Sequence, residues 1–209
     1  EDLHDMPQSL YDGKIKKLRE KTQGRLIIKE YPTASAHSGH FKSLINELAL
    51  KKSFKPDVIF IDYLNICSSA RFKGGNISSY FYIKAIAEEL RGLAVEANVP
   101  IFSATQTTRT GFVSTDLGLE DTSESFGLPA TADFMFALMS NEELEKLGQM
   151  KVKQLKNRYN DPSVNRAFIV GVDRSKMRLY DVQQSSQNIV DANQVEPKEN
   201  AYNKFSDFK

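Results

Sequence analysis

The stretch Lys55-Pro-Asp-Val-Ile-Phe-Ile-Asp-Tyr-Leu-Asn65 decides the fold of this chain. Its centre, Val58 to Ile61, is an unbroken run of β-branched and aromatic residues. Such a run is typical of a strand covered on both faces, as in a parallel sheet that lies between helices. The stretch therefore predicts an α/β fold built around this strand.

Asp62 follows the run, at the carboxyl end of the predicted strand, where open α/β sheets hold their ligands. A carboxylate there can accept hydrogen bonds from water bound to Mg²⁺, which is the role of a Walker B aspartate. The same residues are equally compatible with an ordinary strand-end aspartate that caps the next turn. The rest of the chain has to decide between these interpretations.

Composition bounds the class of protein. The 209 residues are enough for one sizeable domain and few for two. The 28 basic and 27 acidic residues nearly cancel, so any nucleic-acid contact must come from local loops. Cys67 is the only cysteine, which excludes an internal disulfide, and its neighbours favour a packed side chain over a nucleophile. Without a long apolar run or a signal peptide, we expect a cytoplasmic protein.

Before the central stretch, the pattern predicts two helices and a strand. Apolar residues recur at helical spacing over residues 9–22, with lysines between them on a solvated face, and again over residues 41–52. The run Arg25 to Tyr31, stopped by Pro32, predicts a short strand between the helices.

After Asp62 the order of strand and helix repeats. A polar loop is expected over residues 68–79, and an amphipathic helix begins at Ser78 or Ser79 and ends near residue 97. The segment Pro100 to Gln106 predicts another buried strand with a polar residue at its end. The polar stretch 107–127 is too long for a simple connector, so we favour a functional loop there.

The C-terminal part combines strands with a polar tail. The apolar run Phe134 to Met139 predicts a third core strand, and residues 142–147 a short helix. An antiparallel meander is expected from three runs, residues 151–159, 166–172 and 178–182. Residues 183–209 are rich in Gln, Ser, Asn and charge, which predicts a flexible tail.

Polar residues follow these strands in a recognisable order. Asp62 follows one strand, Gln106 the next, and Lys156-Asn157-Arg158 lies on a later hairpin. This order resembles the RecA-type core of DnaB-like hexameric replicative helicases, most closely those of T-even-type bacteriophages. The segments similar to the family's Walker B, sensor, DNA-loop and arginine-finger motifs are Ile61–Leu64, Thr105–Arg109, Asp121–Asp133 and Leu155–Tyr159.

The resemblance implies a site for ATP or another NTP with Mg²⁺. Asp62 would hold the metal beside Tyr63, and Gln106 would sense the γ-phosphate. Arg158, with Lys156 beside it, would reach the nucleotide of a neighbouring subunit, so that hydrolysis depends on assembly. Catalysis of phosphoryl transfer depends mainly on positioning the reacting groups and on neutralising the charge of the phosphates, and these side chains can do both. Without the resemblance, Lys156 and Arg158 are better explained as a strand face in water.

The resemblance also implies contacts to single-stranded DNA. Main-chain amides in such loops can grip phosphates, which lets a nearly neutral chain bind nucleic acid. The candidates are Ser123, Glu124 and Gly127 in the DNA-loop segment, Arg109 before it, and Arg71 and Lys73 in the earlier loop. Ser123 stands where many bacterial relatives carry an arginine, and Glu124 is equally compatible with a helix cap.

The sequence lacks a Gly-x-x-x-x-Gly-Lys-Ser/Thr phosphate-binding loop, and it does not begin with Met. We therefore expect residues 1–182 to form part of an ATPase domain that is inactive alone, with residues 183–209 as a tail. In the RecA-type fold, the strand that leads into the phosphate-binding loop lies inside the sheet, and this sequence does not contain it. The strands near Ile101 and Phe134 should then have unpaired edges, and the isolated chain should be destabilised or aggregation-prone.

The function implied by the resemblance is that of a homo-hexameric phage helicase, which would act in the cytoplasm of the infected bacterium. It would couple NTP hydrolysis to 5′ to 3′ movement along single-stranded DNA and to duplex unwinding, with primase and a helicase loader as partners. A RecA-type recombinase, which forms open filaments, is one alternative, although the Lys156–Arg158 segment argues against it. A docking module that hydrolyses nothing is another, and a phosphate-binding loop encoded upstream of Glu1 would exclude it.

Overall fold

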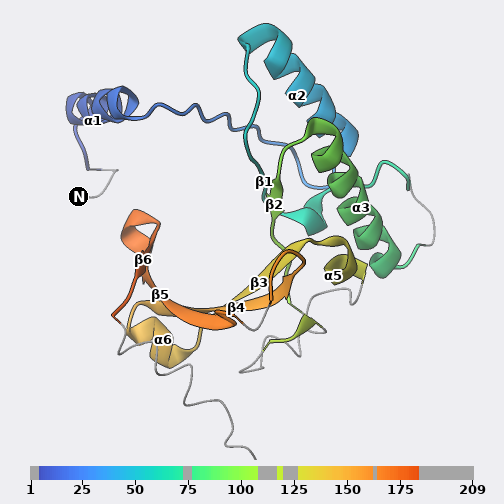
Figure 1. The fold of residues 1–209 in the computed structure, drawn as a ribbon. Coiled ribbons are helices and arrows are strands. Elements are labelled where there is room, and N and C mark those ends of the chain that lie inside the picture. Colours follow the sequence, from blue (N-terminus) through green and yellow to red (C-terminus); the bar gives the residue numbers. More distant parts are fainter. Residues whose placement is uncertain (1–4, 73–76, 108–116, 120–126, 162–163, 184–209) are drawn as a thin grey trace, which may run out of the picture. The chain divides into compact units, whose positions relative to one another are not determined.

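The computed structural model describes residues 5–72, 77–107, 117–119, 127–161 and 164–183 (Figure 1). The chain divides into two compact units, Glu1–Pro32 and Thr33–Lys209. The first unit contains α1 (Gln8–Lys21), which confirms the helix predicted over residues 9–22. None of the residues of α1 is buried by its own unit.

The strand predicted from Arg25 to Tyr31 is wrong. These residues adopt no regular secondary structure, and Leu26 and Ile28 are 81% and 83% exposed. A strand exists only where a neighbour pairs with its backbone groups, and the described residues provide no such neighbour here. The apolar and β-branched composition of the segment therefore did not suffice to make a strand.

The second unit begins with helices beside a parallel pair of strands. The helices α2 (Ser38–Lys52) and α3 (Ser79–Ala97) match the two helices predicted for this region. Strands β1 (Ile59–Ile61) and β2 (Ile101–Ser103) pair in parallel, with Ile59 opposite Ile101. Figure 1 shows α2 and α3 lying alongside each other, and an ion pair between Lys42 and Glu96 joins them.

The core of this unit is centred on α3. Ile86, in the middle of that helix, is 1% exposed. The buried cluster also draws on the short 3-10 helix η1 (Leu64–Ile66) and on α5 (Gly127–Thr131). Its members are Leu64, Cys67, Ile83, Ile86, Ala87, Leu90 and Leu128. The period of apolar residues in α3 thus fixes which face of the helix is buried.

Cys67 lies inside this cluster, as expected for a packed residue. Its Sγ lies 3.7 Å from the carbonyl oxygen of Tyr63, to which it donates a hydrogen bond. Burial raises the pKa of the Cys67 thiol above its ordinary value, because the thiolate is poorly solvated there.

Strand β1 was expected to be covered on both faces, and this expectation is wrong for the described residues. Phe60 is 73% exposed and stacks on Phe102 of β2, which is 48% exposed, with 5.3 Å between the ring centroids. Side chains alternate between the faces of a strand, so this aromatic pair marks one uncovered face of the sheet.

A four-stranded antiparallel sheet completes the unit, in the order β3-β4-β5-β6. The run 134–139, expected as a core strand, forms β3 and adds a fourth strand to the predicted meander. The remaining elements are β3 (Phe134–Met139), α6 (Glu142–Lys146), β4 (Gln149–Asn157), β5 (Ala167–Asp173), η3 (Arg174–Lys176) and β6 (Arg178–Asp181). Helices with one parallel and one antiparallel sheet confirm the α/β class.

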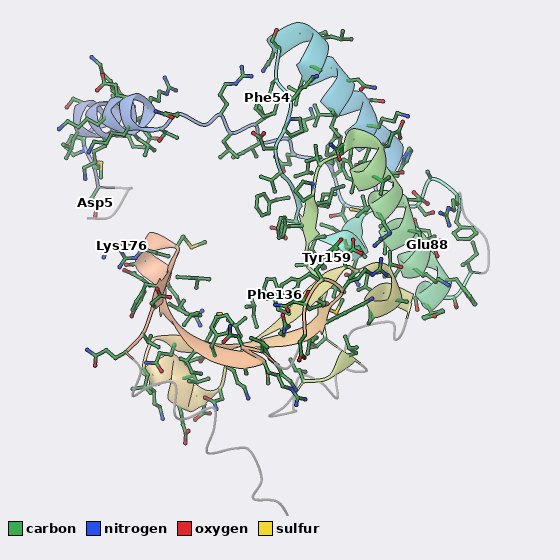
Figure 2. All side chains as sticks on the ribbon, in the orientation of Figure 1. Asp5, Phe54, Glu88, Phe136, Tyr159 and Lys176 are labelled. Atoms are coloured by element: carbon green, nitrogen blue, oxygen red, sulfur yellow. The ribbon has the colours of Figure 1, made fainter. Side chains whose placement is uncertain are left out.

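Among the described strands, β2 and β3 each have an unpaired edge, as expected. In this part of the chain β2 pairs only with β1, and β3 pairs only with β4. Phe134 and Phe136 of β3 are also about half exposed, and Figure 2 marks Phe136 on this strand. Each sheet therefore offers a strand edge to which another chain could pair.

Some predictions fall outside the described residues. These are most of the loop predicted over residues 107–127, and the tail from residue 184 onward. Within the described part of the chain, no helix has the length and apolar character needed to cross a membrane.

Candidate functional site

The carboxyl ends of β1 and β2 bring together the first group of predicted site residues. The amide Nε2 of Gln106 donates a hydrogen bond to the Tyr63 hydroxyl at 3.3 Å. Ser103 Oγ donates to the Ile61 carbonyl at 2.8 Å, and this bond holds the two strand ends in register. Asp62, between Ile61 and Tyr63, has an exposed carboxylate. The parallel pair thus places Asp62, Tyr63 and Gln106 together at the carboxyl ends of the strands, where α/β folds bind ligands.

The carboxyl ends of β1 and β2 are compatible with a magnesium ion that is bound together with a nucleotide. Mg²⁺ in nucleotide sites is held by one or two carboxylates, phosphate oxygens and water. Asp62 offers one accessible carboxylate. The described residues contain no group of three His, Cys, Asp or Glu side chains that could hold a metal by themselves. A single accessible carboxylate is compatible with a metal that phosphates also hold.

A second group lies where the antiparallel sheet meets α3. Asp133 precedes β3, and Arg158 follows β4, just before the Tyr159 marked in Figure 2. Asp133 Oδ1 accepts from Arg158 Nη1 at 2.8 Å and from Arg91 Nη1 of α3 at 2.8 Å. A main-chain bond from Arg158 N to the Asp133 carbonyl, at 2.9 Å, fixes the same pair. One carboxylate therefore joins α3 to both strands.

Lys156 belongs to this group through the end of α5. Its Nζ donates to the Pro129 carbonyl at 2.6 Å, and Arg91 donates to the Thr131 carbonyl at 2.6 Å. Both cations lie at the carboxyl end of the helix, where its dipole favours positive charge. Burial, and then repulsion from Arg158, lower the pKa of Lys156 below its ordinary value. We call Arg91, Asp133, Lys156 and Arg158 the Asp133 cluster.

The structure keeps the two predicted groups separate. Among the described residues, no hydrogen bond or ion pair joins Asp62 or Gln106 to Lys156 or Arg158. An arginine that serves the nucleotide of a neighbouring subunit has no need to contact the site of its own chain. The arrangement is thus compatible with the predicted action between subunits.

Two predicted DNA contacts lie in the described residues. Gly127 is buried at the start of α5, where an added Cβ would lie 3.1 Å from Lys84 Cδ and from Tyr80 Oη. Close packing against α3 therefore accounts for this glycine. Arg71 donates from Nη1 to Glu88 Oε2 at 2.6 Å, which ties it to α3. The other candidates, Lys73, Arg109, Ser123 and Glu124, lie outside the described residues.

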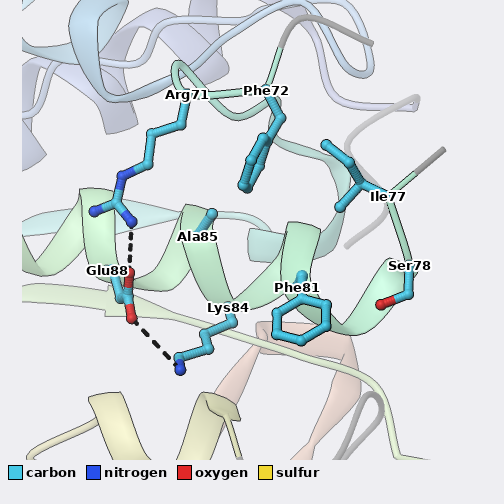
Figure 3. Close-up of a pocket in the computed structure, with 8 residues that line it drawn as sticks. All are labelled: Arg71, Phe72, Ile77, Ser78, Phe81, Lys84, Ala85 and Glu88. Atoms are coloured by element: carbon cyan, nitrogen blue, oxygen red, sulfur yellow. Dashed lines mark hydrogen bonds and ion pairs between the residues drawn. The ribbon is translucent and has the colours of Figure 1, made fainter. Parts of the chain in front are cut away.

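Arg71 also lines a hollow of about 510 Å³ beside the start of α3. Figure 3 shows Phe72 and Phe81 on either side of it, with Glu88 between the cations Arg71 and Lys84. Glu88 Oε1 lies 3.9 Å from Lys84 Nζ. Since one carboxylate neutralises both cations in part, the hollow is only weakly attractive to phosphate.

Three site residues had no individual role predicted from the sequence. Asp133 and Arg91 organise the second group, and Glu89 holds the loop after η1 through hydrogen bonds from Ser69 Oγ and Ala70 N, at 2.6 and 2.8 Å. The sequence of α3 gave one indication of such residues. Its charged residues Glu89 and Arg91 lie next to the apolar face of the helix and are partly buried. Their partners lie far away in sequence, so no local pattern identifies them.

Comparison with known proteins finds a clear relative in sequence. No family model matches the chain. Over 198 residues it is 43% identical to the DnaB-like replicative helicase of Enterobacteria phage T4. The match covers 92% of this chain and 42% of that helicase, so the chain spans less than half the length of this relative.

Solved structures show the same fold at low sequence identity. One solved ATPase domain superposes with a TM-score of 0.68 and 17% identity, over 86% of this chain and 63% of its own. A DnaB-like replicative helicase, solved in a study of its interactions with primase, gives a TM-score of 0.67 and 18% identity, over 86% of this chain and 42% of its own. At these identities the likeness establishes the fold.

Proposed function

Because this chain is a relative of the DnaB-like replicative helicases and has the RecA-type fold of their ATPase domains, we propose that it forms part of a DNA helicase motor. The complete protein would couple NTP hydrolysis to movement along single-stranded DNA and to duplex unwinding. The observation that carries this proposal is the 43% identity to the phage T4 helicase, spread over 92% of the chain.

Asp62 and Gln106 are the proposed nucleotide-site residues of this chain. Asp62 would bind the metal that accompanies the nucleotide, and the metal would neutralise charge on the phosphates. Gln106 would present its amide to the γ-phosphate or to the attacking water. Its hydrogen bond to Tyr63 supports this role, because the bond limits the orientations of the amide beside Asp62.

Arg158 is the proposed arginine finger, with Lys156 beside it. In a homo-hexamer each Arg158 would reach the nucleotide of the next subunit, and its guanidinium would stabilise charge that develops during phosphoryl transfer. Arg158 is 45% exposed, at the end of a strand, so a neighbouring subunit can reach it. An isolated chain should therefore hydrolyse no nucleotide, since it lacks both a phosphate-binding loop and a neighbour.

Single-stranded DNA is the proposed partner of two segments of the chain. The first carries Arg71 and Lys73, and the second carries Arg109, Ser123, Glu124 and, at the start of α5, Gly127. Such binding would rest on phosphate contacts and main-chain amides, since the net charge of the chain is only +1. A primase and a helicase loader are further proposed partners. The structural relative studied together with primase supports the first of them.

The test is the ATPase activity of the full-length protein that carries this chain, with and without single-stranded DNA. We expect DNA to stimulate hydrolysis, and we expect the isolated 209-residue chain, assayed beside it, to be inactive. The proposed function would be contradicted if the full-length protein hydrolysed no nucleotide, or if single-stranded DNA did not change its rate of hydrolysis.

A further inference from the structure

The Asp133 cluster holds Arg158 more firmly than a strand end in water would. Two bonds join Asp133 and Arg158, one between side chains at 2.8 Å and one between main chains at 2.9 Å. A free arginine side chain has many rotamers, and ordering them at the moment of binding lowers the rate or the affinity. The bond between Arg158 Nη1 and Asp133 reduces the number of rotamers that remain to be ordered.

The tie leaves Arg158 able to bind phosphate. A guanidinium has five N–H donors in a rigid fork. The contact with Asp133 uses the Nη1 side of this fork. The contact restricts the directions open to the remaining donors, and such restriction favours a group that stabilises a transition state.

Arg91 keeps Asp133 in place from the other side. It donates from Nη1 to Asp133 Oδ1 at 2.8 Å and to the Thr131 carbonyl at 2.6 Å. Because α3 is anchored in the core by Ile86, Arg91 gives the carboxylate a rigid support. A mobile carboxylate could not orient a guanidinium.

The charge of the cluster also suits an anionic ligand. Arg91, Lys156 and Arg158 contribute +3 and Asp133 contributes −1, which leaves +2. Asp133 therefore orients Arg158 without cancelling the positive potential of the cluster. The side chains of Asp133 and Arg158 are 34% and 45% exposed, and ion pairs this exposed add little to fold stability.

From this geometry we propose that Asp133 is a positioning residue for nucleotide hydrolysis, which orients the Arg158 guanidinium toward the nucleotide of the neighbouring subunit with Arg91 as its support. This inference rests on the proposed function, because it needs Arg158 to act as the finger. It adds two residues, Asp133 and Arg91, that act through Arg158 without touching the nucleotide.

The test is a double-mutant cycle in the full-length protein, measured as DNA-stimulated hydrolysis in steady state and in single turnover. We expect Asp133→Asn to lower kcat about 10- to 100-fold, as expected for a misplaced catalytic group, with KM and the melting temperature nearly unchanged. In an Arg158→Ala background, Asp133→Asn should have no further effect on kcat, because nothing remains to be positioned. Asp133→Glu should restore part of the lost activity.

A matched control is Glu145→Gln, which removes the negative charge from another exposed ion pair of an arginine, the pair with Arg174 at 3.6 Å. This variant should keep the wild-type kcat. If Asp133→Asn does not fold, Arg91→Gln tests the same support and should lower kcat by a smaller factor in the same direction.

The outcomes separate this inference from the proposed function. Normal turnover by Asp133→Asn beside an inactive Arg158→Ala would overturn the positioning role alone. The same loss of kcat from Asp133→Asn in both backgrounds would also overturn it. Normal turnover by Arg158→Ala would overturn the finger assignment and, with it, the role of Asp133.

Discussion

Glu89 shows how one residue can hold the start of the polar loop predicted over residues 68–79. Its carboxylate accepts hydrogen bonds from Ser38 Oγ, Ser69 Oγ, Ala70 N and Arg71 N. Burial raises the pKa of this carboxyl, but the hydrogen bonds, that from Ser69 first, outweigh burial and lower it below its ordinary value of 4.5. The loop that leads to Arg71 is thereby tied to α3.

This leads to a pH prediction. A lowered folded pKa means that Glu89 contributes stability fully above about pH 4.5, and that this contribution is lost as the pH falls through the lowered pKa. We expect Glu89→Gln to cost about 1–2 kcal/mol at pH 7 and to flatten the acid limb of the stability profile. Amide hydrogen exchange at Ala70 and Arg71, with the melting temperature against pH, measures both effects.

Glu47→Gln is the control for this variant, because Glu47 forms an exposed ion pair with Lys51 on α2. It should change stability by less than about 0.5 kcal/mol. Equal protection of the Ala70 amide in wild type and in Glu89→Gln would show that the carboxylate does not hold the loop.

Sequence reasoning at this scale succeeds where a residue is placed by its own strand. Asp62 and Gln106 were expected at neighbouring strand ends, and the structure joins Gln106 to the adjacent Tyr63. It fails where the partner is remote, since Arg91 and Asp133 are 42 positions apart in the sequence. Their ion pair depends on the packing of α3 against α5, which no local pattern encodes.

At the scale of elements, α3 carries the core. Ile86 is 1% exposed, whereas Val95 on the same helix is 73% exposed. We expect Ile86→Ala to destabilise the protein by about 2–4 kcal/mol, through lost burial and a residual cavity. Val95→Ala makes a similar change without a cavity and should stay within about 0.5 kcal/mol. Chemical denaturation of both variants gives the comparison, and equal losses would contradict the assigned face.

The helices could be predicted more completely than the strands, for a physical reason. A helix satisfies its backbone within its own segment, so the period of apolar residues that predicted α2 and α3 was sufficient. A strand depends on its neighbours. Residues 25–31 have strand-like composition, but no described strand pairs with them. Strand β1 has one face covered where two were expected.

At the scale of the whole molecule, the second unit exposes apolar sheet surface. Phe60 and Phe102 stack on an open face, and β2 and β3 each have an unpaired edge among the described strands. Exposed apolar faces and strand edges promote association between chains. We therefore predict that the isolated 209-residue chain self-associates at micromolar concentration.

Phe60→Glu tests this prediction, because it places a charge in the centre of the open face. Sedimentation velocity should show a shift toward monomer. Val95→Glu is the matched control, since Val95 is equally exposed, at 73%, on α3. A wild-type chain that is monodisperse and melts in one sharp transition would contradict the prediction.

The α/β class was predictable because helical and strand patterns alternate along the chain, and the matches in fold confirm it. The separation of Glu1–Pro32 from the rest was not predicted. A unit boundary is a property of contacts between residues, which the sequence does not show directly. The expectation that residues 1–182 act as one ATPase domain stays a prediction.

The buried Cys67 makes this chain convenient for spectroscopy. It is the only cysteine in the sequence, it is packed in the core, and burial disfavours its reactive thiolate. A maleimide dye should therefore leave the native thiol unlabelled and react with a single cysteine introduced on the surface. Fluorescent reporters can be placed one at a time in this 209-residue chain without first replacing any native residue.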